Sequence, residues 1–116
     1  MATLFGRNLT RPDILRRIGR ISQVGGTRMI ELQEGPERGV RAIEFDTGTG
    51  FRFTVLPDRA MDVFDASWCG MSLCWHSVSG AVAPACFDPR GLGWLWGFYG
   101  GLVVTCGLSQ VGGVCS

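Results

Sequence analysis

The sequence has no lysine, one histidine and almost no net charge. All eleven basic residues are arginines, they face ten acidic residues, and the formal net charge is +1. We attribute the absence of lysine to coding bias and infer no function from it. A chain so close to neutral has no broad positive field that would attract nucleic acid or an anionic membrane. We therefore expect no nucleic-acid partner, and we expect any ligand to be recognised by a local site.

Signals for metal binding and secretion are also missing. The five cysteines include no C-x-x-C pair and are Cys69, Cys74, Cys86, Cys106 and Cys115. A zinc site requires closely spaced thiolates or imidazoles, and His76 is the only imidazole, so the sequence predicts no metal site. Residues 1–8 contain no apolar run of the length that a secretory signal needs. We expect buried free thiols in a reducing compartment and a cytoplasmic protein.

The composition predicts one globular domain, residues 1–116, made mostly of strands. Hydrophobic residues make up 46% and charged residues 18% of the chain, which excludes a disordered protein. The 18 glycines favour many turns over long helices. No phosphate-binding glycine loop, nucleophile elbow or paired acidic site is found. The fold class expected is all-β, mainly antiparallel, with a short N-terminal helix.

The expected helix begins after Thr10, which is a suitable N-cap, and ends at Gly19. Its arginines either contact nucleic acid or face solvent, and near-neutrality of the chain favours solvent. Strands are then predicted at residues 29–33, 40–46, 51–56, 62–68 and 71–75. The clearest is 51–56, because Phe51, Phe53 and Val55 alternate with polar residues. Hairpin turns are expected at residues 47–50 and 69–70, and a loop at residues 77–90.

An uncharged, apolar stretch begins at Gly91 and ends at Leu108. Its 18 residues reach the lower length of a membrane-spanning helix, and Gly93, Gly97 and Gly101 have the spacing of closely packed transmembrane helices. A small membrane-anchored protein is therefore one alternative. Its many glycines and aromatic residues have poor helix propensity, so we consider membrane insertion the less favoured interpretation.

Two segments resemble a family of aldose 1-epimerase-like proteins of uncharacterised function, the DUF4432 type, which is related to galactose mutarotase. They are Leu-Pro-Asp-Arg-Ala-Met-Asp-Val at residues 56–63 and Gly-Gly-Leu-Val-Val-Thr-Cys-Gly-Leu at residues 100–108. Supporting matches lie at residues 21–24, 35–41 and 91–94, in the order of the family. The sequence departs from the family at Ala60, where glycine is usual; a positive φ at this position would strain alanine.

The resemblance implies a galactose mutarotase-like β-sandwich that binds a small-molecule carbohydrate. Because family chains are considerably longer, this chain is expected to be the N-terminal part of such a domain. The relatives interconvert sugar anomers without a cofactor, by general acid and base catalysis with a histidine and a glutamate. Both residues are expected beyond Ser116, so the fragment alone is predicted to be catalytically incomplete. A non-catalytic sugar-binding module is the second alternative.

Four residues are candidates for contact with a sugar. Asp58, Arg59 and Asp62 place two carboxylates and a guanidinium at a strand end, where they either converge on ligand hydroxyls or clasp the turn with a salt bridge. Trp94 offers an indole face to the C–H side of a sugar ring, and it is expected to alternate with Trp96 on a strand. Core packing competes with sugar binding for both tryptophans. For His76 we favour a structural role.

Overall fold

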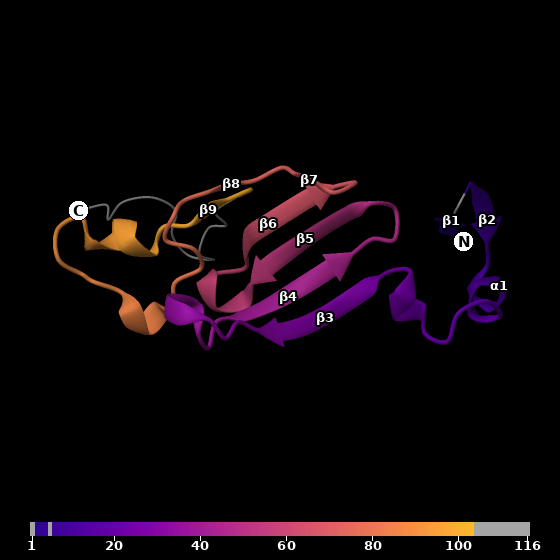
Figure 1. Ribbon diagram of the computed structural model, residues 1–116, viewed down its shortest axis with the longest axis horizontal. Helices are drawn as coiled ribbons and strands as arrows, with labels where there is room; N and C mark the ends of the chain where they lie inside the picture. The colour runs from indigo at the N-terminus through magenta and orange to yellow at the C-terminus, as the bar shows by residue number, and fades with distance from the viewer. Residues whose placement is uncertain (1, 5, 104–116) are drawn as a thin grey trace.

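The computed structural model describes residues 2–4 and 6–103. The molecule is elongated, with extents of 57 × 32 × 24 Å. A central antiparallel sheet separates a small N-terminal hairpin and helix from a group of loops and short 3-10 helices at the other end (Figure 1).

Five strands in sequence order form the central sheet: β3 (Gly26–Glu31), β4 (Arg41–Asp46), β5 (Phe51–Leu56), β6 (Asp62–Trp68) and β7 (Met71–Ser72). Each pairs antiparallel with the next, so the predicted all-β, mainly antiparallel fold is confirmed. The predicted strands at residues 51–56 and 62–68 coincide with β5 and β6. The predicted turns at residues 47–50 and 69–70 join β4 to β5 and β6 to β7.

Smaller elements flank this sheet. At the N-terminal end, β1 (Ala2–Leu4) pairs with β2 (Arg7–Leu9) and α1 (Arg11–Leu15) follows. Short 3-10 helices are Ile21–Gln23, Gly35–Glu37, Pro57–Arg59, Pro84–Cys86 and Gly93–Gly97. Finally, β8 (Trp75–His76) pairs with β9 (Gly100–Gly101).

The N-terminal helix is capped as predicted but is shorter than predicted. Thr10 and Asp13 form a reciprocal capping box, which satisfies backbone donors of the first turn. The helix ends at Leu15, four residues before Gly19. Of its residues only Ile14 is buried, so little packing stabilises a further turn, and short helices without tertiary contacts are marginal in water.

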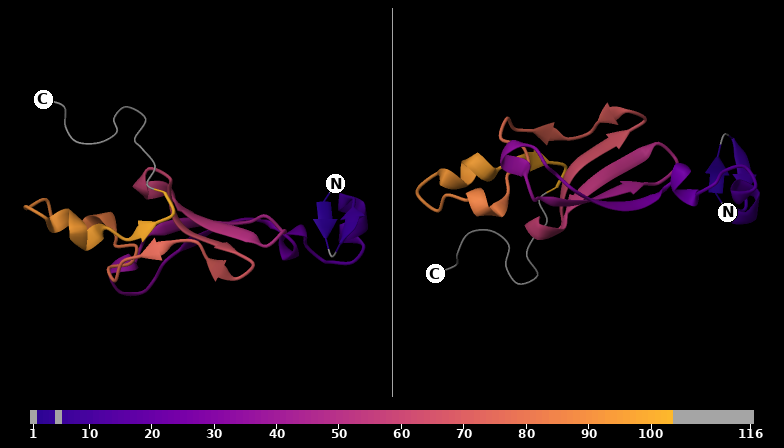
Figure 2. Two further views of the ribbon diagram at one scale, coloured as in Figure 1. Left: turned by 90° about the horizontal axis from the view of Figure 1, so that it is seen from above. Right: turned by 60° about the horizontal axis from the view of Figure 1, so that its bottom comes forward.

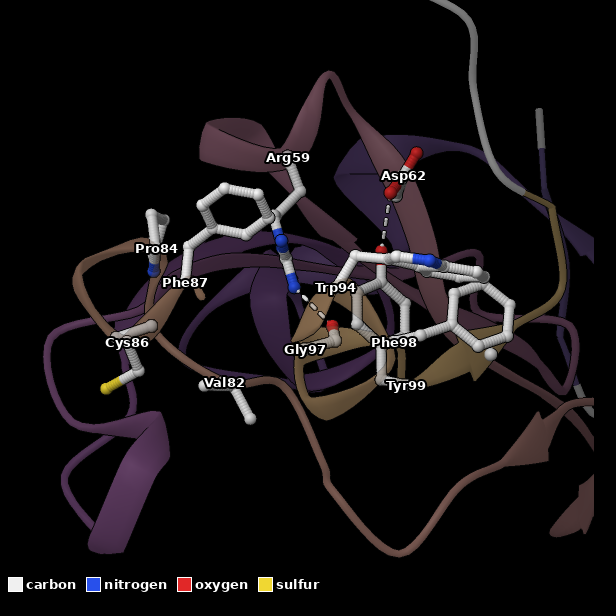
Figure 3. A pocket seen from close by; sticks show the side chains of 12 residues that line it. Arg59, Asp62, Val82, Pro84, Cys86, Phe87, Trp94, Gly97, Phe98 and Tyr99 are labelled. Carbon is white, nitrogen blue, oxygen red and sulfur yellow. Dashed lines mark hydrogen bonds between the residues drawn. The ribbon is translucent and has the colours of Figure 1, made fainter. Parts of the chain in front are cut away.

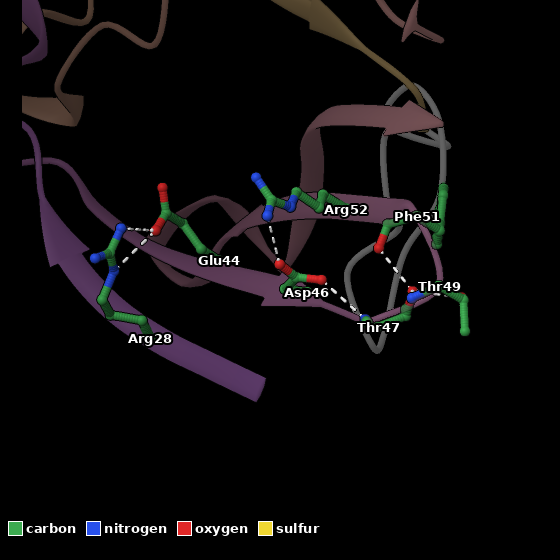
Figure 4. A network of polar contacts seen from close by, with 8 residues as sticks. Arg28, Glu44, Asp46, Thr47, Thr49, Phe51 and Arg52 are labelled. Carbon is green, nitrogen blue, oxygen red and sulfur yellow. Dashed lines mark hydrogen bonds and ion pairs between the residues drawn. The ribbon is translucent and has the colours of Figure 1, made fainter. Parts of the chain in front are cut away.

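One face of the central sheet is polar over most of its length. The register places Arg28, Glu44, Thr54 and Asp65 in one row across four strands. Figure 4 shows two ion pairs on this face, Arg28 with Glu44 at 2.6 Å and Arg52 with Asp46 at 2.8 Å. These cross-strand pairs involve well-exposed arginines, so they fix register more than they add stability.

The opposite face is apolar and carries a row of aromatic rings. Phe45 stacks on Phe53 with centroids 4.5 Å apart, Phe51 lies 5.5 Å from Phe53, and Trp68 lies 6.5 Å from Phe51. Trp68 and its partner Met71 on β7 remain 45% and 64% exposed. The alternation of Phe51, Phe53 and Val55 with polar residues therefore separates two faces, as predicted, but large side chains of the apolar face still reach the surface.

A register shift interrupts the pairing of β5 with β6. Thr54 pairs with Asp65 and Val55 with Val63, so Phe64 is an additional residue on β6. Leu56 and Thr54 are two residues apart on β5 and face the same side, and their partners are Asp62 and Asp65. The bulge therefore places both carboxylates on the polar face.

The core lies where the polar face meets the C-terminal loops. It comprises Val40, Ala42, Leu56, Ala81 and Tyr99. Leu56 is completely buried. The loop of residues 77–90 is held against the sheet by Glu37, whose Oε1 accepts a hydrogen bond from the Ala81 amide at 2.9 Å. This packing positions the C-terminal loops beside the turn between β5 and β6 (Figure 2).

The apolar segment from Gly91 onward does not form the spanning helix that was considered. Its described part, residues 91–103, contains the five-residue 3-10 helix Gly93–Gly97 and then β9; residues 104–108 lie outside the described residues. Of the helices in residues 2–4 and 6–103, none combines the length and apolar character that crossing a bilayer requires. Trp94 and Trp96 lie on the 3-10 helix, so the prediction that they alternate on a strand was wrong.

The prediction of buried thiols was wrong for two of the cysteines. Cys69 lies at the β6–β7 turn and Cys86 in a loop helix, and both are exposed. Turns at the surface leave little apolar material to cover a side chain. Cys74 is partly buried, and all three are free thiols. Cys106 and Cys115 lie outside the described residues.

Replacing Ala60 by glycine is expected to raise the free energy of unfolding by about 0.5–1 kcal/mol. Ala60 has φ 53° and ψ 33°, the left-handed conformation that alanine disfavours. This is the positive φ that would explain why glycine is usual at this position in the family. Urea denaturation followed by circular dichroism measures the change. Ala85→Gly is the control, because exposed Ala85 has no positive φ and its replacement is expected to lower stability. Equal destabilisation by both substitutions would contradict strain at Ala60.

Candidate functional site

A cavity of about 190 Å³ lies between the β5–β6 turn and the C-terminal loops. Its polar groups are Arg59 and Asp62 from the turn region, and its aromatic groups are Phe87, Trp94, Phe98 and Tyr99 from the loops. Figure 3 shows these side chains around the cavity, with the Arg59 guanidinium extending between the loop residues. The structure thus brings together segments that are separated by more than 20 residues in the sequence.

Three of the four predicted sugar-contact residues line this cavity. Arg59 is the last residue of the 3-10 helix Pro57–Arg59, which follows β5 because Pro57 cannot continue the strand ladder. Asp62 begins β6, and Trp94 lies on the helix Gly93–Gly97. The sequence motif at residues 56–63 therefore supplies two groups of opposite charge to one cavity wall, and the loop supplies an indole.

Arg59 is fixed by two contacts and has one unsatisfied donor. Its Nη2 donates to the backbone oxygen of Gly97 at 2.6 Å, and its guanidinium carbon lies 5.5 Å from the centre of the Tyr99 ring. Its Nε is buried and has no hydrogen-bond partner. A buried N–H of a charged group without an acceptor carries a large desolvation cost, which a ligand oxygen would remove.

Asp62 is held by the phenol of Tyr99, which donates to Oδ2 at 2.7 Å. Burial and the neighbouring Asp62 raise the pKa of Tyr99 above its ordinary value, so the phenol remains protonated and a donor at neutral pH. Tyr99 also lies edge-on to Phe64, with centroids 5.1 Å apart. The carboxylate is thereby oriented by a residue of the core.

A family model described as "Domain of unknown function (DUF4432)" matches residues 37–116, more than two-thirds of the chain. The chain belongs to the DUF4432 family. The matched region contains every residue that lines the cavity. No curated protein matches the chain, and no solved structure does.

Asp58 is the predicted residue that this DUF4432 cavity does not include. Its Oδ2 accepts a hydrogen bond from Nε of Arg41 at 2.9 Å, and Oδ1 accepts one from Nη2 of the same guanidinium. Arg41 therefore holds the pKa of Asp58 below its ordinary value. A salt bridge within the turn was considered as the alternative role of these residues. Asp58 does form a salt bridge, but its partner is Arg41 on β4 and not Arg59.

Two further residues of the site were not predicted. Tyr99, the only tyrosine of the sequence, contacts both Arg59 and Asp62, and Phe87 lines the cavity beside Arg59. One signal could have predicted a role for Tyr99: it is a hydroxyl-bearing aromatic residue in an otherwise uncharged, glycine-rich segment. Nothing in the local pattern around Phe87 distinguishes it from a core residue.

Three side chains of the types that ligate metals lie together outside the cavity. They are Asp65 on β6, Cys74 between β7 and β8, and His76 on β8. One ligand atom from each lies within 4.8 Å of the other two. The sequence predicts no metal site for this DUF4432 domain because its ligands have no recognised motif spacing, and the structure shows how two strands bring them together.

Proposed function

We propose that the cavity of this DUF4432 domain binds a carbohydrate, and that one monosaccharide ring is its ligand. The observation that carries the proposal is the buried, unpartnered Nε of Arg59 in the cavity wall. A neutral hydroxyl oxygen of a sugar accepts from this donor without adding charge. Hydrogen bonds to charged groups contribute more than those between neutral groups, so one such contact strongly favours a correctly placed hydroxyl.

The remaining cavity groups match the two kinds of surface on a sugar. The Asp62 carboxylate lines the cavity beside Arg59, and carboxylate oxygens accept hydrogen bonds from hydroxyl groups such as those of a sugar. Trp94 lines the same cavity and is 49% exposed, which leaves indole surface for the C–H side of a ring. A guanidinium, a carboxylate and an indole in one small cavity recognise an amphipathic, polyhydroxylated ring.

The cavity volume limits the ligand to a small one. About 190 Å³ is below the range of roughly 300–1,000 Å³ that is typical of sites for drug-sized molecules. A single ring is therefore favoured over an oligosaccharide. The openness of the cavity toward solvent also allows further sugar units to extend outward without being bound.

We place the chain in the galactose mutarotase-like superfamily and assign binding, not anomer interconversion, to the described residues. Anomer interconversion requires a general acid and a general base on the sugar. In the described part of the cavity Asp62 is the candidate base, and Tyr99 is a poor acid because its pKa is raised. The apolar face with Phe45, Phe51 and Phe53 supports the β-sandwich of the superfamily, since a second sheet would cover it.

Replacing Trp94 by alanine is expected to weaken monosaccharide binding about tenfold, which corresponds to about 1.4 kcal/mol. The loss follows from removal of the indole face. Isothermal titration calorimetry with D-glucose, D-galactose, D-mannose and L-rhamnose measures the affinity of the full chain. Trp96→Ala is the matched control, because Trp96 is 74% exposed on the same helix and does not line the cavity.

The two variants separate the proposal from a general effect on the helix. We expect Trp96→Ala to bind as the unmodified chain does. Equal affinities for all three proteins, or no heat of binding with any of the four sugars, would refute carbohydrate binding in this cavity.

A further inference from the structure

The Asp65, Cys74 and His76 cluster lies outside the cavity lining and joins β6 to the segment that leads into β8. Cys74 and His76 are two residues apart in extended chain, so their side chains lie on the same side. The hydrogen bond from the Leu73 amide to the Ala66 oxygen, at 2.9 Å, keeps this segment beside β6. Asp65 faces the same side, because it lies two residues from Ser67, whose partner Ser72 lies two residues from Cys74. Backbone pairing, and not side-chain flexibility, therefore brings the three groups together.

The imidazole of His76 is oriented by the backbone. Its Nε2 lies 2.8 Å from the oxygen of Phe64, and its ring stacks on the Phe64 ring with centroids 4.8 Å apart. A carbonyl oxygen only accepts, so Nε2 is the donor in this contact, and a metal ion bound at Nδ1 would leave the contact in place. Hydrogen bonding of one ring nitrogen to a backbone carbonyl is the usual way in which metal-binding histidines are oriented.

The charges around the cluster favour a cation. Nε2 of His76 lies 3.7 Å from Oδ1 of Asp65, and among the described residues no arginine forms a salt bridge with this carboxylate. Burial raises the pKa of Cys74, and the negative charge of Asp65 adds to the increase. A divalent cation would compensate the Asp65 carboxylate and would displace the proton of the Cys74 thiol, because metal ions bind the thiolate form.

We propose that Asp65, Cys74 and His76 form a zinc site with one position open to water. Sulfur, imidazole nitrogen and carboxylate oxygen are the three donor types that Zn²⁺ binds in proteins, and three protein ligands with an open position are typical of non-structural zinc sites. Bond lengths of about 2.0–2.3 Å bring such ligand atoms to roughly 3.5 Å from one another, so closure by about 1 Å from the observed arrangement suffices. His76 is exposed and Asp65 and Cys74 are partly exposed, which leaves a path for the ion and a water molecule.

The proposed zinc site lies near the edge of the central sheet, and a chain of side-chain contacts connects it to the cavity. The Phe64 ring contacts both His76 and Tyr99, and Tyr99 orients Asp62. Zinc binding crosslinks β6 to the segment that leads into β8, and it therefore stabilises the folded chain by mass action. The proposal does not depend on carbohydrate binding.

Titration of the metal-free full chain with Co²⁺ tests the site. The background carries Cys106→Ser and Cys115→Ser, which leaves Cys69, Cys74 and Cys86 as the thiols, and a phosphine keeps them reduced. Cobalt bound to a thiolate gives a near-ultraviolet charge-transfer band, and low coordination number gives intense visible bands. We expect one equivalent of Co²⁺ to produce both, and one equivalent of Zn²⁺ to abolish them by displacement.

Variants assign the signal to the three residues. Cys74→Ser is expected to abolish the charge-transfer band, and Asp65→Asn and His76→Gln are expected to weaken Co²⁺ binding at least tenfold. Cys86→Ser is the matched control, because this exposed thiol lies outside the cluster, and its titration is expected to be unchanged. Zinc is also expected to raise the melting temperature of the Cys86→Ser chain and not that of the Cys74→Ser chain.

Two results would overturn the proposal. One is a titration without a thiolate band, and the other is a band that persists in Cys74→Ser. If Cys74→Ser fails to fold by circular dichroism, the exposed His76→Gln variant decides the question, since unchanged Co²⁺ affinity there also refutes the site.

Discussion

Replacing Leu56 by alanine is expected to lower the free energy of unfolding by about 2–5 kcal/mol. Leu56 is the largest side chain that is completely buried among the described residues, and it contacts the core from the end of β5. The core around it is small, so neighbouring side chains offer little material to fill the resulting cavity. Domains are typically stable by about 5–15 kcal/mol, so the loss is a large fraction of the total.

Urea denaturation of the full chain, followed by circular dichroism, measures this effect. Leu92→Ala is the control, because Leu92 is 70% exposed and its replacement is expected to change stability by less than about 0.5 kcal/mol. Similar unfolding midpoints for Leu56→Ala and Leu92→Ala would show that the core identified here does not stabilise the chain.

Replacing Arg59 by alanine is expected to weaken monosaccharide binding by about 10- to 100-fold. The substitution removes the buried Nε donor, and hydrogen bonds to charged groups contribute about 1.5–3 kcal/mol. It also removes the contact with the Gly97 oxygen, so some loss of thermal stability is expected as well. Arg59→Lys keeps the charge but has no group equivalent to Nε, and we expect it to bind weakly too.

Calorimetric titration with the best of the four monosaccharides, together with a thermal melt, separates binding from folding. Arg90→Ala is the control, since Arg90 pairs with the nearby Asp88 and does not line the cavity. If Arg59→Ala lowers the melting temperature but keeps the affinity for sugar, Arg59 is a structural residue. In that case the Trp94→Ala result alone bears on carbohydrate binding.

The strands of the central sheet were predictable because the signals for them are local. Alternation along residues 51–56 and glycine-containing turns at residues 47–50 and 69–70 specify consecutive hairpins, and each strand then pairs with its neighbour in sequence. The helix start was predictable from Thr10 and Asp13. Its end was not, because the length of a helix depends on packing that only the folded chain shows.

The candidate site was predictable only in part, because its composition depends on contacts between distant residues. Arg59 and Asp62 were found from one short motif, and both line the cavity. Asp58 belongs to the same motif, but it forms an ion pair with Arg41, which lies 17 residues away in the sequence, and it does not line the cavity. No local pattern specifies which of the two acidic residues of the motif, Asp58 or Asp62, meets an arginine from another strand.

The aromatic residues that line the cavity were also predictable only in part. Trp94 was predicted to lie on a strand, and it lies on a 3-10 helix, yet it still reaches the cavity. Its contact with the site depends on the way the loops pack on the sheet, which secondary structure alone does not determine. Tyr99 and Phe87 lie in the same C-terminal loops, and their roles follow from that packing.

The single additional residue at Phe64 connects the cavity with the cluster of Asp65, Cys74 and His76, because its ring contacts both Tyr99 and His76. Asp62 and Asp65 are separated by an odd number of positions, so an uninterrupted pleat would direct their side chains to opposite surfaces. Deleting Phe64 would shorten this separation to two positions, so both carboxylates would still face the polar side, and the ring that contacts His76 and Tyr99 would be lost. Loss of this one codon would therefore separate the two groups of side chains without turning either carboxylate to the other face.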